Sequence, residues 1–336
     1  MNSIKRFFKA RGMGPALTAF AGFFVIYIAF GIINPMVFSS GNVMNLLRSM
    51  SKYLLIGIGQ SYVLITGNID LSIGSVVGMS AMISATLMTM GVHPVLAILI
   101  TMVCCMAVGA LNGLLVGKFR LPPFIATLGT MFVARGAAYM VNGNRNTDAI
   151  ASGIGKEAAD KLQSFFYYGK TFGIYNTFWI AIILFAVFFF LLSKTRMGRH
   201  TYAIGSNLDA AQLSGVNVGA TTTKAYLVSA FCAGVVGLIL CAQAGMGNME
   251  AGTMYEMYGV AAGVIGGVSP LGGTGILLGT LAGSAVWQTL ENGLNMIGAQ
   301  VGIQRLVIGV IVVFSVLIEV VFRGRKFKWA GAQKKD

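Results

Sequence analysis

Long apolar runs alternate with short polar breaks along the whole chain. Five runs in the first half cover Pro15 to Pro35, Tyr53 to Thr66, Ile73 to Met90, Val95 to Gly117 and Phe124 to Val141. Five more cover Tyr175 to Ser193, Ala225 to Ala242, Gly259 to Val268, Ile276 to Ile297 and Gly302 to Phe322. A membrane-spanning helix needs roughly 20 apolar residues, and continuous runs argue against a barrel of alternating strands. If the short runs cross, the pattern predicts an all-α polytopic membrane protein with about ten transmembrane helices.

The segments between the runs are expected to alternate between the two sides of the membrane. Met36 to Lys52, Asn142 to Phe172 and Ala244 to Tyr258 are assigned to the outer side. Two polar breaks that contain glycine, Gly67 to Gly74 and Ser269 to Gly275, also separate apolar runs. Glycines at four-residue spacing predict close helix packing in a compact bundle. Two such sets are Gly74 with Gly78, and Gly109 with Gly113 and Gly117.

A polar, basic island from Lys194 to Val218 interrupts the apolar sequence. Within it, Asn207 to Val216 is predicted to form a small helix, because Asn207 is a favourable N-cap and Asp209 suits the positive end of the helix dipole. Gly215 stands where the helix should stop. A small, flat surface on this helix suits docking to another protein. Its residues are Ala210, Ala211 and Leu213.

Composition and charge agree with a membrane location. The 336 residues are 56% hydrophobic and 10% charged, whereas soluble domains carry about 25% charged residues. A net charge of +14 could indicate nucleic acid, but most of the 24 Lys and Arg lie in four segments that one topology places on the same side. Those segments are residues 1–13, 118–120, 194–224 and 323–336. This positive-inside pattern predicts cytoplasmic termini in a lipid bilayer and no nucleic-acid partner.

We therefore expect one transmembrane domain over residues 1–336. Its cytoplasmic parts are the N-terminus at 1–13, a loop at 194–224 and a basic tail at 323–336, and the tail could also contact acidic lipid headgroups. The first apolar run is too long for the core of a signal peptide, and no small-residue cleavage site follows it. It is predicted to remain as the first span.

Residues typical of enzyme active sites and metal centres do not group in this sequence. His93 lies at a turn and His200 in the basic island, and the four cysteines occupy apolar runs without metal or redox spacing. Gly169-Lys-Thr171 resembles the end of a phosphate-binding loop, but Ser164 stands where that loop needs its first glycine. The sequence therefore predicts no catalytic residue, cofactor or metal ion in this chain.

Polar residues within or beside the spans are candidates for function, because such residues are costly in a membrane. They are Asp70, Asn112, Arg135, Glu291, Asn292, Asn295, Gln304 and Arg305. Three of them, Glu291, Asn292 and Asn295, occupy neighbouring helical positions. They either line a cavity or form helix-to-helix hydrogen bonds, with Arg305 or Arg135 as partner of Glu291. Asp70, beside Ser72 at a break, is expected to act as a helix cap.

Two classes of function remain on this physical reasoning. One is a transporter subunit driven by a separate motor protein that docks at the island. The other is a self-contained ion-coupled carrier, which needs titratable groups at mid-membrane, where only Glu291 is a fair candidate. A membrane-embedded enzyme lacks a recognisable site. Dependence on ATP and a partner, rather than on an ion gradient, would separate the first two classes.

Several motifs together identify a family. They are Gly67-Asn-Ile-Asp-Leu-Ser-Ile-Gly-Ser75, Pro123-Phe-Ile-Ala-Thr-Leu-Gly129 with Arg135-Gly136, Thr195-Arg-Met-Gly-Arg199, Ala203-Ile-Gly-Ser-Asn207, Ala210-Ala-Gln-Leu-Ser-Gly-Val-Asn-Val218, and Gly266-Gly-Val-Ser269 with Gly272-Gly-Thr-Gly275. Over nearly its whole length the chain resembles the permease subunits of bacterial ABC importers for ribose, xylose, arabinose and galactosides. That group also includes autoinducer-2 permeases and, more distantly, branched-chain amino-acid permeases. Two positions depart from the family, which usually has Gly at Asn68 and an acidic residue at Tyr258, near the expected outer gate.

The resemblance implies a bacterial inner-membrane permease that is not itself an enzyme. Its expected partners are a second permease copy, either identical or a close paralogue, and a cytoplasmic ATPase that carries ATP and Mg²⁺. A periplasmic or lipid-anchored sugar-binding protein would deliver a pentose or hexose. The non-sugar solutes and the ion-coupled carrier stay open as alternatives.

The resemblance also assigns the island as the coupling helix that sits in a groove of the ATPase. The expected coupling residues are Arg196, Gly198, Asn207, Ala210, Ala211, Leu213, Ser214 and Gly215. The candidate residues of the translocation path are Phe124, Thr127, Glu291, Asn292 and Asn295. Within such a transporter, closure of the ATPase on ATP would push the coupling helix and tilt the bundle between inward-open and outward-open states.

Overall fold

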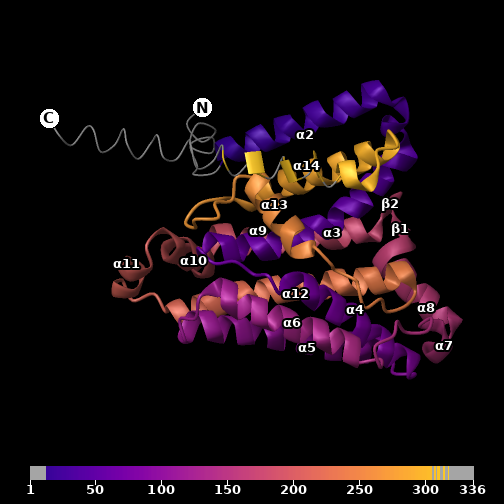
Figure 1. The fold of residues 1–336 in the computed structure, drawn as a ribbon, viewed down its shortest axis with the longest axis horizontal. Helices are drawn as coiled ribbons and strands as arrows, with labels where there is room; N and C mark the ends of the chain where they lie inside the picture. The colour runs from indigo at the N-terminus through magenta and orange to yellow at the C-terminus, as the bar shows by residue number, and fades with distance from the viewer. Residues whose placement is uncertain (1–12, 305, 308, 311–312, 315–316, 318–336) are drawn as a thin grey trace.

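Long helices run side by side between two ends of the molecule in the computed structural model, which describes residues 13–304, 306–307, 309–310, 313–314 and 317 (Figure 1). Within these residues, four helices are long and apolar enough to cross a membrane. They are α2 (Met13–Ile33), α5 (Pro94–Gly113) continued by η2 (Leu114–Lys118), α9 (Asn176–Lys194) and α12 (Val218–Ala244). α4 (Ile73–Thr89) is apolar but shorter. The protein is an α-helical, multi-pass membrane protein, as the sequence predicts.

Further helices complete the bundle and its connections. The longer ones are α3 (Ser40–Ile65), α6 (Pro123–Met140), α13 (Tyr255–Ile265) and α14 (Leu277–Met296). The shorter ones are η1 (Pro35–Phe38), α7 (Ala151–Ile154), α8 (Lys156–Gln163), η3 (Ser164–Tyr168), α10 (Arg196–Ser206) and α11 (Leu208–Leu213). β1 (Lys170–Thr171) and β2 (Ile174–Tyr175) form a short antiparallel pair. Most of the run from Gly302 to Phe322, residues 1–12 and the tail lie outside the described residues.

Several segments that the sequence placed between the apolar runs contain helix, and two of them extend a neighbouring span. Most of Met36 to Lys52 belongs to α3, which begins at Ser40 because the Ser39 side chain accepts a hydrogen bond from the Asn42 backbone nitrogen at 3.3 Å. Similarly, Asn217 caps α12 by accepting from the Ala220 nitrogen at 2.9 Å. The loop expected at 194–224 therefore ends at Asn217. In both cases a local capping side chain extends the helix beyond its apolar run.

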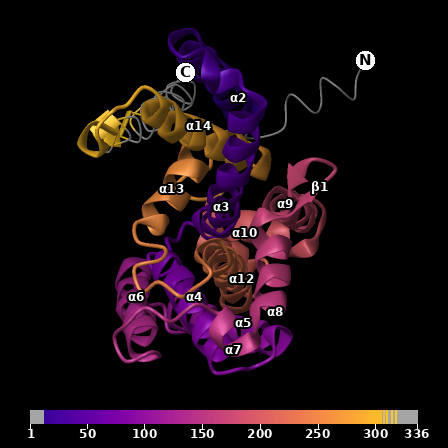
Figure 2. The same cartoon turned by 90° about the vertical axis from the view of Figure 1, so that its right-hand side faces the viewer.

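The core of the bundle is built around α12. Figure 2 shows this helix in the middle of the molecule, and it packs against α3, α4 and α5. Glycines on α5 and η2 allow a close approach: a Cβ placed on Gly109 would lie 2.6 Å from the Ala230 Cβ, and one on Gly117 would lie 2.9 Å from the Gly219 carbonyl oxygen. The four-residue glycine spacing along α5 and η2 thus corresponds to a helix contact, as expected.

The two ends of the bundle carry different elements. α10 and α11 project at one end, which we call the α10 end, and α7, α8 and the β1–β2 pair lie at the other, the α8 end (Figure 1). At the α8 end, the Arg48 guanidinium of α3 lies 4.4 Å from the ring centre of Tyr167 and 4.1 Å from that of Tyr175. These cation–π contacts attach the β1–β2 pair to the start of α3.

Replacing Gly109 by Ala should lower the stability of the α5–α12 contact. The added methyl group would overlap the Ala230 Cβ and come within 2.8 Å of the Tyr226 carbonyl oxygen. We expect a loss of about 1–3 kcal/mol, only partly offset by the better helix propensity of alanine. The measurement is the unfolding midpoint of the purified protein in detergent.

Gly129→Ala on α6 is the matched control, because a Cβ at Gly129 meets nothing within 4 Å. Alanine favours a helix over glycine by about 1 kcal/mol, so this variant should be at least as stable as the parent protein. Equal midpoints for the two variants would contradict the close α5–α12 packing.

Candidate functional site

The island at the α10 end forms two consecutive helices, α10 and α11. The Asn207 side chain accepts a hydrogen bond from the Ala210 nitrogen at 2.8 Å, so it caps α11 as predicted. Gly215 has a φ of 81°, a left-handed conformation that suits glycine and ends the helix. α11 is shorter than the predicted 207–216 segment, since it stops at Leu213. The predicted small helix with its two end signals is therefore confirmed.

The exposed surface of α11 differs from the expected one. Leu213 is 90% exposed, but Ala211 is only 5% exposed and packs with Ile204 and Val218 beneath the helix. Ala211 is therefore not part of the outer face, because a short helix must bury one side to be held in place. Leu208, Ala210, Ser214 and Gly215 share the exposed side of the loop with Leu213.

Two expected coupling residues come from the Thr195 to Arg199 motif, and their surroundings differ. Arg196 is exposed at the start of α10, whereas Gly198 is buried. A Cβ on Gly198 would overlap the Leu192 backbone of α9. Gly198 thus serves the sharp turn from α9 into α10, and of these two only Arg196 is available to a partner.

α10 contacts the turns that precede two other helices. The Tyr202 hydroxyl donates to the Gly275 carbonyl oxygen at 2.7 Å, and the Gly273 nitrogen donates to the Ile65 carbonyl oxygen at 2.9 Å. A Cβ on Gly205 would lie 2.5 Å from the Gly273 nitrogen and would overlap the Ile65 carbonyl oxygen. One short helix therefore touches both the end of α3 and the turn that leads into α14.

The break between α3 and α4 is organised by Asp70, which is 2% exposed. Its Oδ1 accepts from the Ser72 nitrogen at 2.9 Å and the Ser72 hydroxyl at 2.6 Å. Its Oδ2 accepts from the Ser229 hydroxyl of α12 at 2.7 Å. The carboxylate thus lies at the N-terminal end of α4, where the helix dipole favours a negative charge. Asp70 therefore holds Ser72, the N-cap residue of α4, rather than being the N-cap itself.

The contacts of Asp70 continue into a buried chain of hydrogen bonds. The Asn112 amide of α5 donates to the Ser72 hydroxyl at 2.8 Å, and the Thr130 hydroxyl of α6 donates to the Asn112 side-chain oxygen at 2.6 Å. Together with Ser229, the chain links α4, α5, α6 and α12. The sequence singled out Asn112, but Thr130 and Ser229 were missed because hydroxyl residues inside apolar runs are common and carry no sign of their partners.

Arg135 of α6 holds a second break, residues 245–254 between α12 and α13. Its guanidinium donates to the carbonyl oxygens of Met249 at 2.8 Å and Ala251 at 2.9 Å, and more weakly to that of Gly74 on α4 at 3.4 Å. A Cβ on Gly78 would lie 2.6 Å from the Arg135 Nη1, so the glycines of α4 make room for the guanidinium. The predicted pairing of Arg135 with Glu291 is wrong, because these carbonyl oxygens occupy Arg135 instead.

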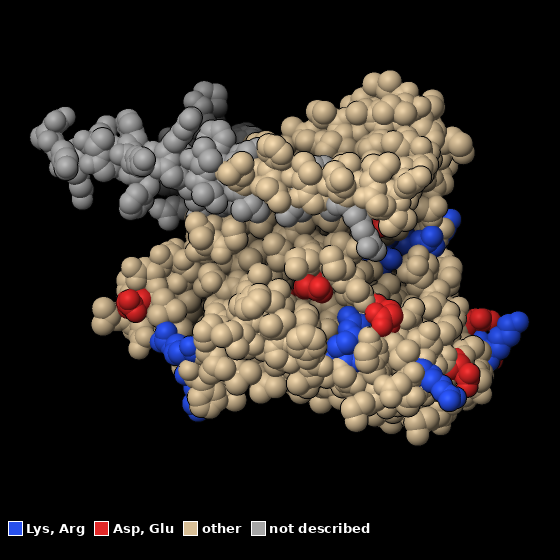
Figure 3. Space-filling model, in the orientation of Figure 1, with Lys and Arg blue, Asp and Glu red and all other residues tan. Residues whose placement is uncertain are grey.

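Two carboxylates accompany Arg135. Glu250 accepts a hydrogen bond from the Tyr139 hydroxyl at 2.7 Å, and the Glu256 carboxylate lies against Gly74. Among the described residues, neither carboxylate comes within ion-pair distance of Arg135, although the charge of Arg135 acts on both. Figure 3 shows acidic and basic side chains together between α6 and α13, in the middle of a face that is otherwise largely uncharged.

The path candidates on α14 bond to neighbouring helices. Glu291 accepts from the Tyr53 hydroxyl of α3 at 2.7 Å. Asn292 exchanges two hydrogen bonds with Asn42, at 3.0 and 2.9 Å. Asn295 accepts from Gln304 at 2.8 Å. These are contacts of the helix-to-helix kind, in which Glu291 bonds to Tyr53 and Arg135 bonds elsewhere, and a lining role stays a prediction. Arg305 lies outside the described residues.

The other two path candidates lie elsewhere. Phe124 is 57% exposed, and the Thr127 hydroxyl donates to the Pro123 carbonyl oxygen of its own helix at 2.8 Å. This part of α6 follows Arg120, which donates to Gln212 of α11 at 2.9 Å, so it belongs to the α10 end. The end of α14 lies near Asn34, which follows α2 at the opposite end. The structure thus does not bring the five path candidates together.

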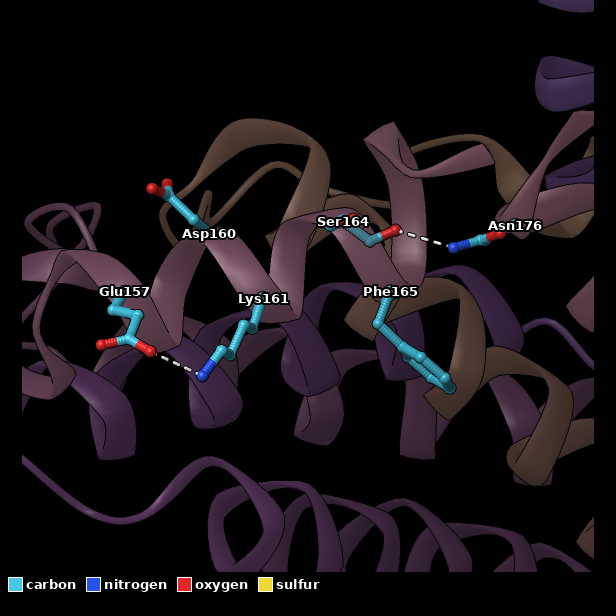
Figure 4. A pocket seen from close by; sticks show the side chains of 6 residues that line it. All are labelled: Glu157, Asp160, Lys161, Ser164, Phe165 and Asn176. Atoms are coloured by element: carbon cyan, nitrogen blue, oxygen red, sulfur yellow. Dashed lines mark hydrogen bonds and ion pairs between the residues drawn. The ribbon is translucent and has the colours of Figure 1, made fainter. Parts of the chain in front are cut away.

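An open pocket at the α8 end carries no comparable chemistry (Figure 4). Lys161 and Glu157 point toward each other in an exposed ion pair of 2.6 Å, and the Asn176 amide donates to the Ser164 carbonyl oxygen at 3.1 Å. Asp160 points away from them. These groups satisfy one another on an exposed surface, so we do not regard the pocket as the functional site.

Comparisons with known proteins identify the chain. A family model described as branched-chain amino acid transport system / permease component matches residues 42–316. The ribose import permease protein of Bacillus subtilis (strain 168) is 36% identical over 309 residues, which cover 92% of this chain and 94% of the relative. The D-allose transport system permease protein of Escherichia coli (strain K12) is 32% identical over 297 residues, or 88% of each chain.

A third relative agrees with these two. The galactose/methyl galactoside import permease protein of Haemophilus influenzae (strain ATCC 51907 / DSM 11121 / KW20 / Rd) is 33% identical over 313 residues, which cover 88% of this chain and 92% of the relative. No solved structure matches the chain. The matches span almost all the helices described above, and the relatives are transport subunits rather than enzymes. The chain therefore belongs to the permease components of the branched-chain amino acid transport system family, within which it is similar to sugar import permeases.

Proposed function

We propose that this chain is the membrane-spanning subunit of an ATP-binding cassette importer that moves a small sugar into the cytoplasm. The observation that carries the proposal is the similarity to ribose, allose and galactoside permeases over most of the chain. The sugar is a pentose or hexose. A branched-chain amino acid is the second candidate, because the family model bears that description.

The proposed partners occupy different parts of the molecule. A cytoplasmic ATPase, which carries ATP and Mg²⁺, docks at the α10 end through Leu213 and the exposed side of α11. We also propose that both termini are cytoplasmic and that the chain has about ten spans, on the basis of the apolar runs and of the basic segments near Lys194 and in the tail. A periplasmic or lipid-anchored sugar-binding protein meets the α8 end, and a second permease copy completes the membrane unit.

The contacts of α10 could transmit a movement of the ATPase to the interior of the bundle. Tyr202 bonds to the turn before α14, and Gly205 packs against both Gly273 and the end of α3. Because these contacts are tight and involve backbone atoms, a displacement of α10 moves both turns with it. The end of α3 leads directly to the Asp70 break. Movement of the docked ATPase would thus reach the broken helices inside the bundle.

Leu213→Glu should weaken docking of the ATPase while the permease stays folded. Leu213 is 90% exposed, so it makes few contacts within the chain. Burial of a leucine in a partner contributes about 1.5–3 kcal/mol, so we expect at least about a tenfold loss of affinity. The measurement is co-purification of the ATPase subunit with the tagged permease from membranes.

Phe172→Glu is the matched control, because Phe172 is 92% exposed in the β1–β2 turn at the opposite end. This variant should retain the ATPase. Retention of the ATPase by Leu213→Glu at the parent level would contradict docking at α11. Ala211→Arg and Gly215→Arg would be unsuitable tests of docking. Ala211 is buried, and Gly215 has a positive φ that arginine rarely adopts.

Uptake into liposomes should require ATP and the partner subunits. The permease reconstituted with its ATPase and sugar-binding protein is expected to accumulate labelled sugar when ATP is enclosed with the ATPase. The permease alone should accumulate none under a proton or sodium gradient, because Glu291, the candidate group for ion coupling, is engaged in a hydrogen bond from Tyr53. Accumulation driven by an ion gradient without nucleotide would show an ion-coupled carrier instead.

A further inference from the structure

The two broken helices meet inside the bundle. The break at 66–72 enters from the α10 end, where a Cβ on Gly272 would lie 2.8 Å from the Gly67 Cα. The break at 245–254 enters from the α8 end, where a Cβ on Gly245 would lie 2.8 Å from the Gln163 amide. The two segments come together at Gly74, whose Cβ would lie 2.6 Å from the Gly252 carbonyl oxygen.

The lengths of the helices agree with a meeting point between the two ends. α4 has 17 residues and α13 has 11, both fewer than the roughly 20 that a complete span needs. Each begins at the meeting point, so both N-terminal ends lie there. Discontinuous helices in transporters place solute sites near the middle of the membrane. A helix end alone does not establish a site, however, and the surrounding side chains must be considered.

Gln60 of α3 provides an independent indication. Its side chain is 0% exposed, and both atoms of its amide lack a hydrogen-bond partner among the described residues. Gln60 lies where α3 contacts α13, because a Cβ on Gly259 would be 3.2 Å from the Gln60 Cβ. Gly259 is one helical turn beyond Glu256. The neighbouring Gly59 packs against Ile73 and against Ser229, the partner of Asp70.

An unpartnered amide at this depth is unfavourable in the closed bundle, since a buried donor and acceptor have lost water without replacement. A polar molecule that enters between α3 and α13 would supply these partners. Glu256 lies one helical turn before Gly259 on α13, and its carboxylate contacts Gly74, whose carbonyl oxygen accepts a weak hydrogen bond from Arg135 at 3.4 Å. Arg135 and Glu256 are both partly exposed. Charged groups in a membrane face a partner or a water-filled path rather than lipid.

We propose that Gln60, Glu256 and Arg135 form a contact site for a neutral, polyhydroxylated solute on the translocation path, with a second copy of this chain covering the exposed side. The amide and carboxylate accept hydrogen bonds from hydroxyl groups, and the guanidinium and amide donate to their oxygens. A cation is a poorer fit because Arg135 places positive charge beside Glu256 and the Asp70 oxygens already accept three hydrogen bonds. This inference rests on the proposed sugar import.

Gln60→Leu tests the site because it separates stability from transport. Leucine removes the unpartnered amide with little change in volume, so the unfolding midpoint should rise. The maximal rate of ATP-driven sugar uptake in reconstituted liposomes should fall about tenfold or more, in proportion to the loss of one or two hydrogen bonds to the solute. Glu256→Gln should lower the same rate.

Thr86→Val is the matched control. The Thr86 hydroxyl is also buried without a partner, but it lies in the last turn of α4, far along the helix from Ile73. This variant should gain stability and keep the parent uptake rate. Unchanged uptake in both Gln60→Leu and Glu256→Gln would overturn the proposed site while leaving sugar import intact.

A second readout applies if Gln60→Leu does not accumulate in the membrane. Glu256→Cys, in a background without the four native cysteines, should react with a polar thiol reagent during ATP turnover, and transported sugar should slow the reaction. Absence of labelling in every transport state would overturn the site. Parent transporter that imports no pentose or hexose would overturn the proposed function, and the sugar assignment of this site with it.

Discussion

Backbone groups that leave a helix at the depth of a bilayer must find partners inside the protein, because lipid offers none. This constraint shapes the two breaks of the bundle in opposite ways. At the first break the Asp70 carboxylate accepts from the backbone amide of Ser72, the residue just before α4. At the second break the free groups are carbonyl oxygens, and the Arg135 guanidinium donates to them. Each break therefore needs a charge of the matching sign.

These two charged residues also connect the breaks to the rest of the molecule. Asp70 bonds to Ser229 on α12, and through Ser72 to Asn112 on α5, so it cannot move without several helices. Arg135 connects the second break to the first turn of α4, since it reaches Gly74 as well as Met249 and Ala251. A displacement that begins at α10 reaches the first break through the end of α3. It is then shared with the second break through Arg135 and the contact of Gly74 with Gly252.

The sequence predicts much of this fold, because its signals are local. Apolar runs and caps such as Asn207 locate helices, and the family motifs identify the class of protein. The prediction is less accurate where a cap lies outside the apolar run, as at Ser39 and Asn217, because hydropathy follows the lipid environment rather than the hydrogen bonds that start a helix. The burial of Ala211 was missed for a related reason: composition does not show which side of a short helix packs inward.

The interior site was beyond the reach of sequence patterns for a different reason. The pair Gly74 and Gly78 is a common helix-packing signal, yet one of these glycines accommodates a carboxylate and the other a guanidinium. Gln60 lies in an apolar run where nothing distinguishes it from a residue with a partner.

The significance of Gln60 comes from its three-dimensional contacts alone. A buried amide without partners costs about 1–3 kcal/mol, and leucine would fill the same space without that cost. Stability of this closed arrangement therefore does not account for glutamine at position 60, whereas a state in which a polar solute separates α13 from α3 does.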